Sequence, residues 1–196
     1  MLQEELINSF LEFLELAIHI SLWSRKLYAA DLFERVKYCG FNARKSRHPG
    51  LNSYISSTVG NLKGLIKSGT LKEVAVVFFD LKGCPVDRIT FALQVEQLSP
   101  QASLSSLDIS ALESGFTSAL LVLSCADRLH RPLPTGSTFE VVAYSISRSG
   151  VDVNYFSEDA LQRLELRQPL KAHALKSVNV EGFLHLQVLL EQTAGT

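Results

Sequence analysis

Residues 73–95 read EVAVVFFDLKGCPVDRITFALQV, the strongest structural pattern in the chain. Residues 73–81 form an almost continuous apolar run, which is typical of a central strand covered on both faces. Residues 82–85 have the composition of a turn. Residues 88–95 then alternate apolar and polar side chains, as a strand with one buried face does. The stretch therefore predicts an antiparallel β-hairpin in the middle of a sheet.

A long apolar helix is predicted before this hairpin, over residues 2–27. Apolar residues almost encircle its axis, so we expect it to lie at the centre of a core. Its narrow polar stripe holds Asn8, Glu12, Glu15 and His19. Because His19 continues a stripe with two carboxylates, we interpret it as solvated or salt-linked rather than as a ligand or a base.

Two further helices are predicted from periodicity and capping residues. Residues 49–67 form the second, which Pro49 opens and Gly69 ends. Residues 108–125 form the third, and Asp108 is its expected N-cap. Residues 28–47 between the first two helices are expected to be irregular and then extended.

The C-terminal part of the chain combines two strands with a segment that has no clear period. Residues 138–147 and 183–190 predict strands. In the last strand the apolar set should face the core, leaving the alternate residues on the other face: Leu184, Leu186, Val188 and Leu190 against Phe183, His185, Gln187 and Leu189. Residues 148–182 are expected to form a long irregular arm, and such arms are usually functional. The order predicts an α+β fold with an antiparallel sheet.

Composition limits the classes of protein to consider. The chain has 196 residues, a net charge of −1 and 46% hydrophobic residues, which suits one globular domain over 1–196. Three widely spaced cysteines, Cys39, Cys84 and Cys125, argue against a disulfide framework or a zinc site. We expect them to be buried free thiols in a reducing compartment. Neither a signal peptide nor a membrane span is expected, because charged residues interrupt the apolar N-terminal stretch.

Motifs for catalysis are missing from the sequence. It contains no nucleophile elbow, zinc-protease helix, P-loop or dinucleotide fingerprint, and the five histidines share no metal-ligand spacing. Two short basic clusters, 44–48 and 128–131, could contact phosphates, but solvated loops are the favoured reading for a nearly neutral chain. These patterns indicate a binding module rather than an enzyme.

The sequence resembles the HORMA-domain family, most closely the branch that holds the accessory subunit of DNA polymerase zeta. The resemblance rests on short stretches along most of the chain: 11–15, 17–19, 25–28, 32–33, 46–55 (SRHPGLNSYI), 74–80, 85–88, 138–139, 175–178 and 186–187. It implies a HORMA fold, in which an antiparallel sheet packs on three helices. Residues 1–147 would form the core, and residues 148–196 the "safety belt" arm and closing strand. The belt wraps an extended peptide that adds a strand to the sheet.

The resemblance also implies partners and sites, and no cofactor or metal. In this branch the trapped peptide contains proline and comes from the catalytic subunit of polymerase zeta. Tyr54 matches a peptide-binding tyrosine, and Tyr155 or Phe156 is the nearest belt aromatic. Leu175, Gln187 and Leu189 match positions that bind the C-terminal domain of the Rev-one scaffold polymerase. An AAA+ remodelling ATPase is a further implied partner, whereas direct nucleic-acid and membrane binding are not expected.

Three expectations follow about role, location and assembly. The implied role is a nuclear adaptor in translesion DNA synthesis, with cytoplasmic presence left open. The alternative is another HORMA role, in spindle-checkpoint, meiotic or double-strand-break repair signalling. Family members dimerise through a basic residue on the third helix, but Phe116 falls near that position and the helix has no Lys or Arg. We therefore expect weak or absent homodimerisation by this route.

Overall fold

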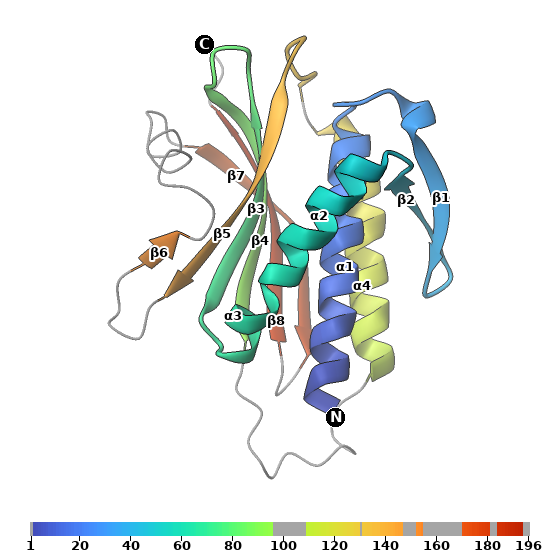
Figure 1. Cartoon of the computed structure of the whole chain (residues 1–196), viewed down its shortest axis with the longest axis vertical. Helices are drawn as coiled ribbons and strands as arrows, with labels where there is room; N and C mark the ends of the chain where they lie inside the picture. Colours follow the sequence, from blue (N-terminus) through green and yellow to red (C-terminus); the bar gives the residue numbers. More distant parts are fainter. Residues whose placement is uncertain are drawn as a thin grey trace.

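The computed structural model describes residues 2–95, 109–129, 131–146, 152–154, 170–180 and 184–193. A six-stranded antiparallel sheet with strand order β6-β5-β3-β4-β8-β7 carries helices α1, α2 and α4 on one face (Figure 1). A two-stranded sheet, β1-β2, lies on the far side of these helices (Figure 1). The elements are α1 (Leu2–Ser24), η1 (Ala30–Leu32), β1 (Phe33–Tyr38), β2 (Phe41–Ser46), α2 (Pro49–Asn61), α3 (Lys63–Lys67), β3 (Leu71–Phe79), β4 (Pro85–Val95), α4 (Ile109–Ser124), η3 (Ala126–Arg128), β5 (Thr138–Ile146), β6 (Asp152–Asn154), β7 (Leu170–Val180) and β8 (Leu184–Thr193).

The predicted central hairpin is confirmed. β3 and β4 pair antiparallel, and β3 also pairs with β5, so β3 lies inside the sheet. Its side chains are buried on both faces, as the continuous apolar run indicated. Val74, Val76 and Phe78 join the main core under the helices, whereas Ala75, Val77 and Phe79 form a second small cluster on the opposite face.

The long apolar helix is also confirmed, but the expectation for His19 was wrong. His19 is completely buried, because the β1-β2 hairpin covers that end of the polar stripe. The backbone N–H of Ser46 lies 3.4 Å from Nδ1 of His19, and Lys45 forms an ion pair with Glu15 at 2.7 Å. Burial, together with the charge of Lys45, lowers the pKa of His19 to about 4.

The low pKa of His19 predicts acid sensitivity. The unfolded chain binds a proton near pH 6.5, whereas the folded chain binds it only near pH 4. The free energy of unfolding should therefore fall as the pH drops from about 6.5 to 4, by on the order of 3 kcal/mol from this residue. Denaturant titrations across this range should show a smaller fall in His19→Gln. The control is His185→Gln, because the His185 side chain is exposed. Equal pH profiles of stability for wild type and His19→Gln would refute the lowered pKa of His19.

The second predicted helix forms as two pieces. His48 caps α2 by accepting a hydrogen bond from the Leu51 N–H at 3.2 Å, and Pro49 occupies the first turn as predicted. The helix ends at Asn61, because the N–H of Leu62 bonds to the Val59 carbonyl only three residues back, at 3.0 Å. α3 then continues to Lys67, and Gly69 adopts the positive φ of 68° that suits a helix stop.

Two other expectations were wrong. The irregular arm predicted over 148–182 contains an eleven-residue strand, β7. β7 is an edge strand and Val178 is its only buried residue among those whose burial is described, so the apolar alternation that marks a strand is absent. The three cysteines are free but exposed, because Cys39 lies in the β1-β2 turn, Cys84 in the β3-β4 turn and Cys125 beyond the end of α4.

The helices are apolar enough to raise the question of a membrane span. By length and composition alone, Glu4–Ser24 and Ile109–Arg128 could cross a membrane. Phe13 of α1 stacks on Phe116 of α4 with ring centroids 4.3 Å apart, and both rings are fully buried. α4 also approaches β7 closely at Gly115, where a Cβ atom would lie 2.4 Å from a methyl group of Val178. Both helices therefore contribute apolar side chains to the core, with 67% of the α1 stretch and 33% of the α4 stretch buried inside the protein.

Candidate functional site

A surface hollow lies between α2, the outer side of β5 and the segment that leads into β1. Its volume is about 700 Å³, and its lining is mostly apolar and aromatic. We call it the groove, defined by Tyr28, Leu32, Phe33, Ser46, His48, Leu51, Tyr54, Thr58, Phe139, Glu140 and Val141. Large apolar side chains remain accessible there: Tyr54 is 43% exposed, Leu32 40% and Tyr28 38%. Such exposure in a concave site is typical of a surface that binds another molecule.

Three aromatic rings organise the groove. Tyr54 and Tyr28 each meet Phe139 edge to face, with centroid distances of 5.8 and 6.4 Å. α2 supplies Tyr54, β5 supplies Phe139, and Tyr28 lies just beyond α1. Burial, and then the nearby Tyr54, raises the pKa of Tyr28, so the Tyr28 phenol is neutral at physiological pH. The rings form a fixed apolar surface with hydroxyl groups at its edge.

A backbone donor of the sheet faces the groove. Val141 pairs with Val76 on the β3 side of β5, and its N–H donates to the Tyr54 hydroxyl oxygen at 3.3 Å. β6 pairs with β5 only from Tyr144 to Ile146. At Val141 a tyrosine hydroxyl thus takes the place that a neighbouring strand's carbonyl would occupy. An extended peptide entering the groove can contact both a strand edge and the aromatic rings.

After β6, the chain passes from one edge of the main sheet to the other. β6 ends at Asn154 beside β5, and β7 begins at Leu170 at the opposite end of the strand order (Figure 1). Residues 155–169 must therefore connect the two edges. β8 then runs back between β7 and β4, and its predicted core set of Leu184, Leu186, Val188 and Leu190 is fully or almost fully buried, which confirms the predicted alternation.

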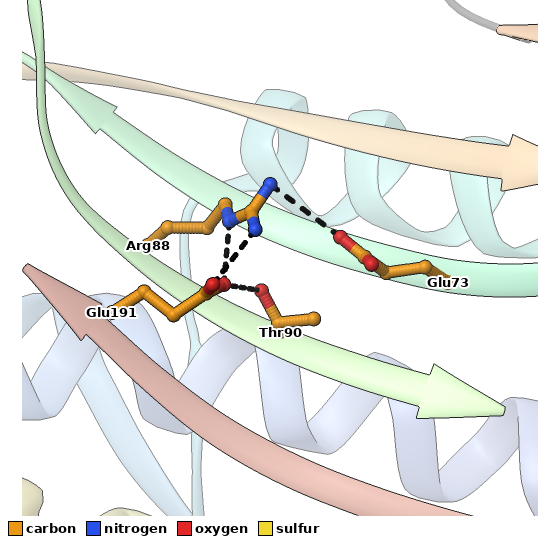
Figure 2. Close-up of polar contacts among 4 residues, drawn as sticks. All are labelled: Glu73, Arg88, Thr90 and Glu191. Atoms are coloured by element: carbon orange, nitrogen blue, oxygen red, sulfur yellow. Dashed lines mark hydrogen bonds and ion pairs between the residues drawn. The ribbon is translucent and has the colours of Figure 1, made fainter. Parts of the chain in front are cut away.

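A polar cluster fastens β8 to β4 on the sheet face away from the helices. Arg88 of β4 makes a two-pronged ion pair with Glu191 of β8, with Nε–Oε2 and Nη2–Oε1 distances of 2.6 and 2.9 Å (Figure 2). The Thr90 hydroxyl donates to the same carboxylate, and Glu73 of β3 lies 3.5 Å from Arg88 (Figure 2). Paired hydrogen bonds to a planar guanidinium are strong and directional, so the cluster holds the register between these strands.

The surroundings of the two carboxyl groups in this cluster shift their pKa values in opposite directions. Burial alone would raise the pKa of Glu191, but the hydrogen bonds from Arg88 and Thr90 outweigh it and the pKa is lowered. Burial raises the pKa of Glu73, and the more distant Arg88 offsets this only in part. Glu191 is therefore the carboxylate that keeps its charge as the pH falls, which preserves the attachment of β8.

Side chains that could hold a metal ion do not cluster among the described residues of the groove. Across the described part of the chain, no group of three or more His, Cys, Asp or Glu side chains is placed to hold a metal ion. His48, the one imidazole lining the groove, uses Nδ1 to cap α2. The lining of the hollow therefore suits an apolar, extended ligand.

Comparisons with known proteins show which solved structures and which sequences this chain is similar to. No family model matches the chain. A chain in the crystal structure of the mitotic checkpoint complex superposes with a TM-score of 0.78 at 16% identity, covering 96% of this chain and 98% of that one. HTP-2 bound to HTP-3 motif-6 gives a TM-score of 0.72 at 11% identity, covering 98% and 92%. The DNA polymerase zeta processivity subunit of Arabidopsis thaliana is 31% identical over 189 residues, which is 95% of this chain and 86% of that relative.

The chain belongs to the HORMA-domain family. Within it, this HORMA domain resembles the polymerase zeta accessory-subunit branch. The mitotic spindle assembly checkpoint protein MAD2B of Bos taurus is 32% identical over 134 residues, 68% of this chain and 63% of that relative. The α+β architecture of this chain, an antiparallel sheet under helices, confirms the predicted fold class. The relatives support an adaptor role for the HORMA domain.

The HORMA domain brings only some of the predicted site residues together. Tyr54 lines the groove. Tyr155 and Phe156 lie outside the described residues. Gln187 and Leu189 lie half-buried on the sheet face away from the helices, beside Ala92 and Thr90 of β4. Leu175 sits at an irregularity in β7 and packs against the helix-side core, so it does not share a face with them.

Two groove residues were not singled out as site residues. Tyr28 and Phe139 lie far apart in sequence, and each appeared only within a stretch similar to the family. No periodicity links them, because one lies between α1 and η1 and the other begins β5. Pairing of β5 with β3 places Phe139 opposite Phe78, and this register brings its ring under the two tyrosines.

Proposed function

We propose that this HORMA domain is a non-catalytic nuclear adaptor in translesion DNA synthesis. It captures a proline-containing peptide of the polymerase zeta catalytic subunit in the groove, and the segment between β6 and β7 closes over the peptide as a safety belt. The observation that carries the proposal is the Tyr54 hydroxyl on the Val141 N–H, inside an aromatic-lined hollow. The polymerase zeta processivity subunit of Arabidopsis thaliana supports this choice of partner.

The chemistry of the groove suits such a peptide. An added strand gains affinity from main-chain hydrogen bonds, and the side-chain pockets give specificity. Tyr28, Tyr54 and Phe139 supply rigid aromatic faces, on which a proline ring packs without losing conformational freedom. Proline has no N–H, so it leaves no donor unpaired where it meets an apolar wall. A peptide with apolar residues around a proline fits this lining better than a charged one.

Tyr54 is the direct test of the groove. Tyr54→Ala should weaken binding of a fluorescent peptide from the polymerase zeta catalytic subunit by about 30-fold, which corresponds to about 2 kcal/mol at an aromatic hot spot. Tyr54→Phe removes only the hydroxyl contact with Val141 and should cost far less. Thermal unfolding should change little in either variant, because the ring is 43% exposed. Unchanged affinity in Tyr54→Ala would remove the groove from the proposal.

A second contact would bridge the captured polymerase to the Rev-one scaffold. We place it on the outer face of β8, where Gln187 and Leu189 lie side by side with part of each side chain accessible. Leu175 belongs to the other side of the sheet and is left out of this contact. Bridging requires two separate surfaces, and neither Gln187 nor Leu189 lines the groove.

The double variant Gln187→Ala/Leu189→Ala should lower affinity for the Rev-one C-terminal domain while leaving peptide capture at the wild-type level. Pull-downs with each ligand measure the two activities separately. Leu186→Ala is the matched control on the buried face, and it should lower the free energy of unfolding by roughly 2–5 kcal/mol. Loss of both binding activities in a folded double variant would show that the surfaces are not independent.

Another HORMA role is the second candidate function. MAD2B of Bos taurus carries a spindle-checkpoint name, and solved relatives include HTP-2 bound to HTP-3 motif-6 and HTP-2 bound to a HIM-3 closure motif. Checkpoint, meiotic or double-strand-break repair peptides would use the same groove. Affinity capture from the native cell distinguishes them, since the polymerase zeta role requires recovery of its large catalytic subunit. An AAA+ ATPase recovered with it would be the expected agent that reopens the belt.

A further inference from the structure

The basic cluster of residues 44–48 does not survive as a cluster in the folded chain. Lys45 pairs with Glu15 at 2.7 Å, and Arg47 lies 3.8 Å from Glu34. His48 caps α2. Arg44 forms no ion pair with a described residue, and its guanidinium lies 5.2 Å from the ring centroid of Trp23. The solvated-loop interpretation therefore fails for Arg44, which is held on the face of an aromatic ring.

Folding creates a different basic cluster from residues that are apart in sequence. In the β1-β2 register, Arg35 lies directly opposite Arg44, and Lys37 lies opposite Asn42 on the same face. Arg35 and Lys37 are exposed, and neither forms an ion pair within the described part of the chain. Like charges directly opposite each other destabilise a strand pair. The hairpin thus carries an uncompensated positive charge on one face.

Arg35 and Arg44 border a hollow that is also lined by two aromatic side chains. The hollow has a volume of about 330 Å³ and is lined by Ile20, Trp23, Arg35, Phe41, Asn42, Arg44 and Ser124. None of these residues lines the groove. Two guanidinium groups at the rim offer forked donors to carboxylates, while Trp23 and Phe41 offer aromatic surface to an apolar side chain. The site therefore combines positive charge with aromatic surface at one end of the helical layer.

We propose that this hollow docks a short acidic segment of a protein partner, in which carboxylates flank one apolar anchor residue. The carboxylates pair with Arg35 and Arg44, and the anchor packs on Phe41, next to Trp23. This surface is separate from the groove, so the inference does not depend on the peptide captured there. Charge complementarity selects the occupant, because two arginines lie opposite each other here although the net charge of the chain is −1.

A nucleic acid fits these observations less well. Single strands are bound by basic grooves that follow the backbone over several nucleotides, with a series of stacking aromatics. Here the cations are few, they belong to one two-stranded ribbon, and Arg44 already covers a face of the indole. A compact ligand with adjacent carboxylates matches a pair of arginines at cross-strand spacing, roughly 5 Å between Cβ atoms.

Trp23 gives a direct readout, because it is the only tryptophan in the chain. The probe is a synthetic peptide with a central Leu-Phe pair flanked by Asp and Glu residues, titrated at low salt while indole fluorescence is recorded. We expect a saturable change with a dissociation constant on the order of 10–100 μM, weakened by added salt. Matched probes are the same peptide with Lys in place of the acids and a single-stranded oligodeoxythymidine.

Charge reversal locates the binding. Arg35→Glu/Arg44→Glu should weaken binding of the acidic peptide by at least tenfold and should create binding of the Lys peptide. Lys82→Glu, an exposed change in the β3-β4 turn, is the control and should bind like wild type. The gained affinity for the Lys peptide shows that a reversed variant is folded and that charge at this site decides the partner.

Several results would overturn the proposal. One is an acidic peptide that leaves Trp23 unchanged or binds Arg35→Glu/Arg44→Glu equally well. Another is preferential binding of the oligonucleotide at this face, which would assign it to nucleic acid. A third is a concentration-dependent dimer in sedimentation that Arg35→Glu/Arg44→Glu abolishes, which would assign the face to a second copy of the chain.

Discussion

Cutting the backbone within residues 155–169 is expected to raise the dissociation rate of a captured peptide by on the order of a hundredfold. β6 lies beside β5 at one edge of the sheet and β7 lies at the other, so this segment joins the two edges. If it closes over the peptide, an intact chain must release the belt before the peptide can leave. A specific protease site placed within 155–169 allows peptide dissociation to be measured in one sample before and after cleavage.

Cleavage is a cleaner test than removal of everything from Gly150 onward. Such a truncation also deletes β8, whose Leu184, Leu186, Val188 and Leu190 belong to the core, and so would destabilise the whole domain. In the cleaved chain, the Arg88–Glu191 ion pair and the strand pairing can still hold β8 in place. The control is the same site inserted in the β3-β4 turn after Lys82. Equal dissociation rates before and after cleavage would eliminate the belt from the mechanism.

Replacing Arg25 by Met should lower the free energy of unfolding by about 3–5 kcal/mol, a large change for a single substitution. Arg25 and Asp87 form an ion pair at 2.6 Å, and their side chains are only 4% and 2% exposed. Arg25 also donates to the Arg131 carbonyl at 2.8 Å and lies over the Phe78 ring. Removing the guanidinium leaves a buried carboxylate without this charge partner, and such a group is costly to bury.

The double variant Arg25→Met/Asp87→Leu separates the cost of removing the charge partner of Asp87 from the value of the ion pair. It should recover much of the stability lost in Arg25→Met, because exchanging a buried ion pair for apolar side chains is often nearly neutral. Chemical denaturation measures all three differences. Lys26→Met is the control, since the neighbouring Lys26 side chain is 81% exposed and its ion pair with Asp127 spans 3.9 Å. Equal losses for Arg25→Met and Lys26→Met would contradict this account.

Local patterns predicted the central parts of the fold. The apolar run of β3 and the alternation in β8 identified strands and their buried faces, because interior strands bury enough side chains to leave a period in the sequence. β7 left no such period, since it is an edge strand whose stability comes from backbone pairing with β8. His19 was misplaced for a related reason: its burial is imposed by the β1-β2 hairpin, which is not visible from the helix alone.

The candidate site was predicted only in part. Family resemblance identified Tyr54, but the groove also needs Tyr28 and Phe139, and the register of β5 against β3 brings these rings together. In the same way, the Arg35–Arg44 pair depends on the turn at Cys39 and Gly40, both with positive φ, which sets the pairing of β1 with β2. Long-range register is a tertiary property, so no single stretch of sequence reports it.

The pairing of β4 with β8 has a consequence for how fast the domain folds. Arg88 and Glu191 are 103 residues apart in the chain. The length of this loop has a weak effect on the equilibrium stability, since the entropy cost of closing a loop grows only with the logarithm of its length. The rate is more strongly affected, because contacts between distant residues raise the relative contact order and slow folding. Until β8 arrives, the hydrogen-bonding edge of β4 stays open, and in that interval it can template non-native strand pairing.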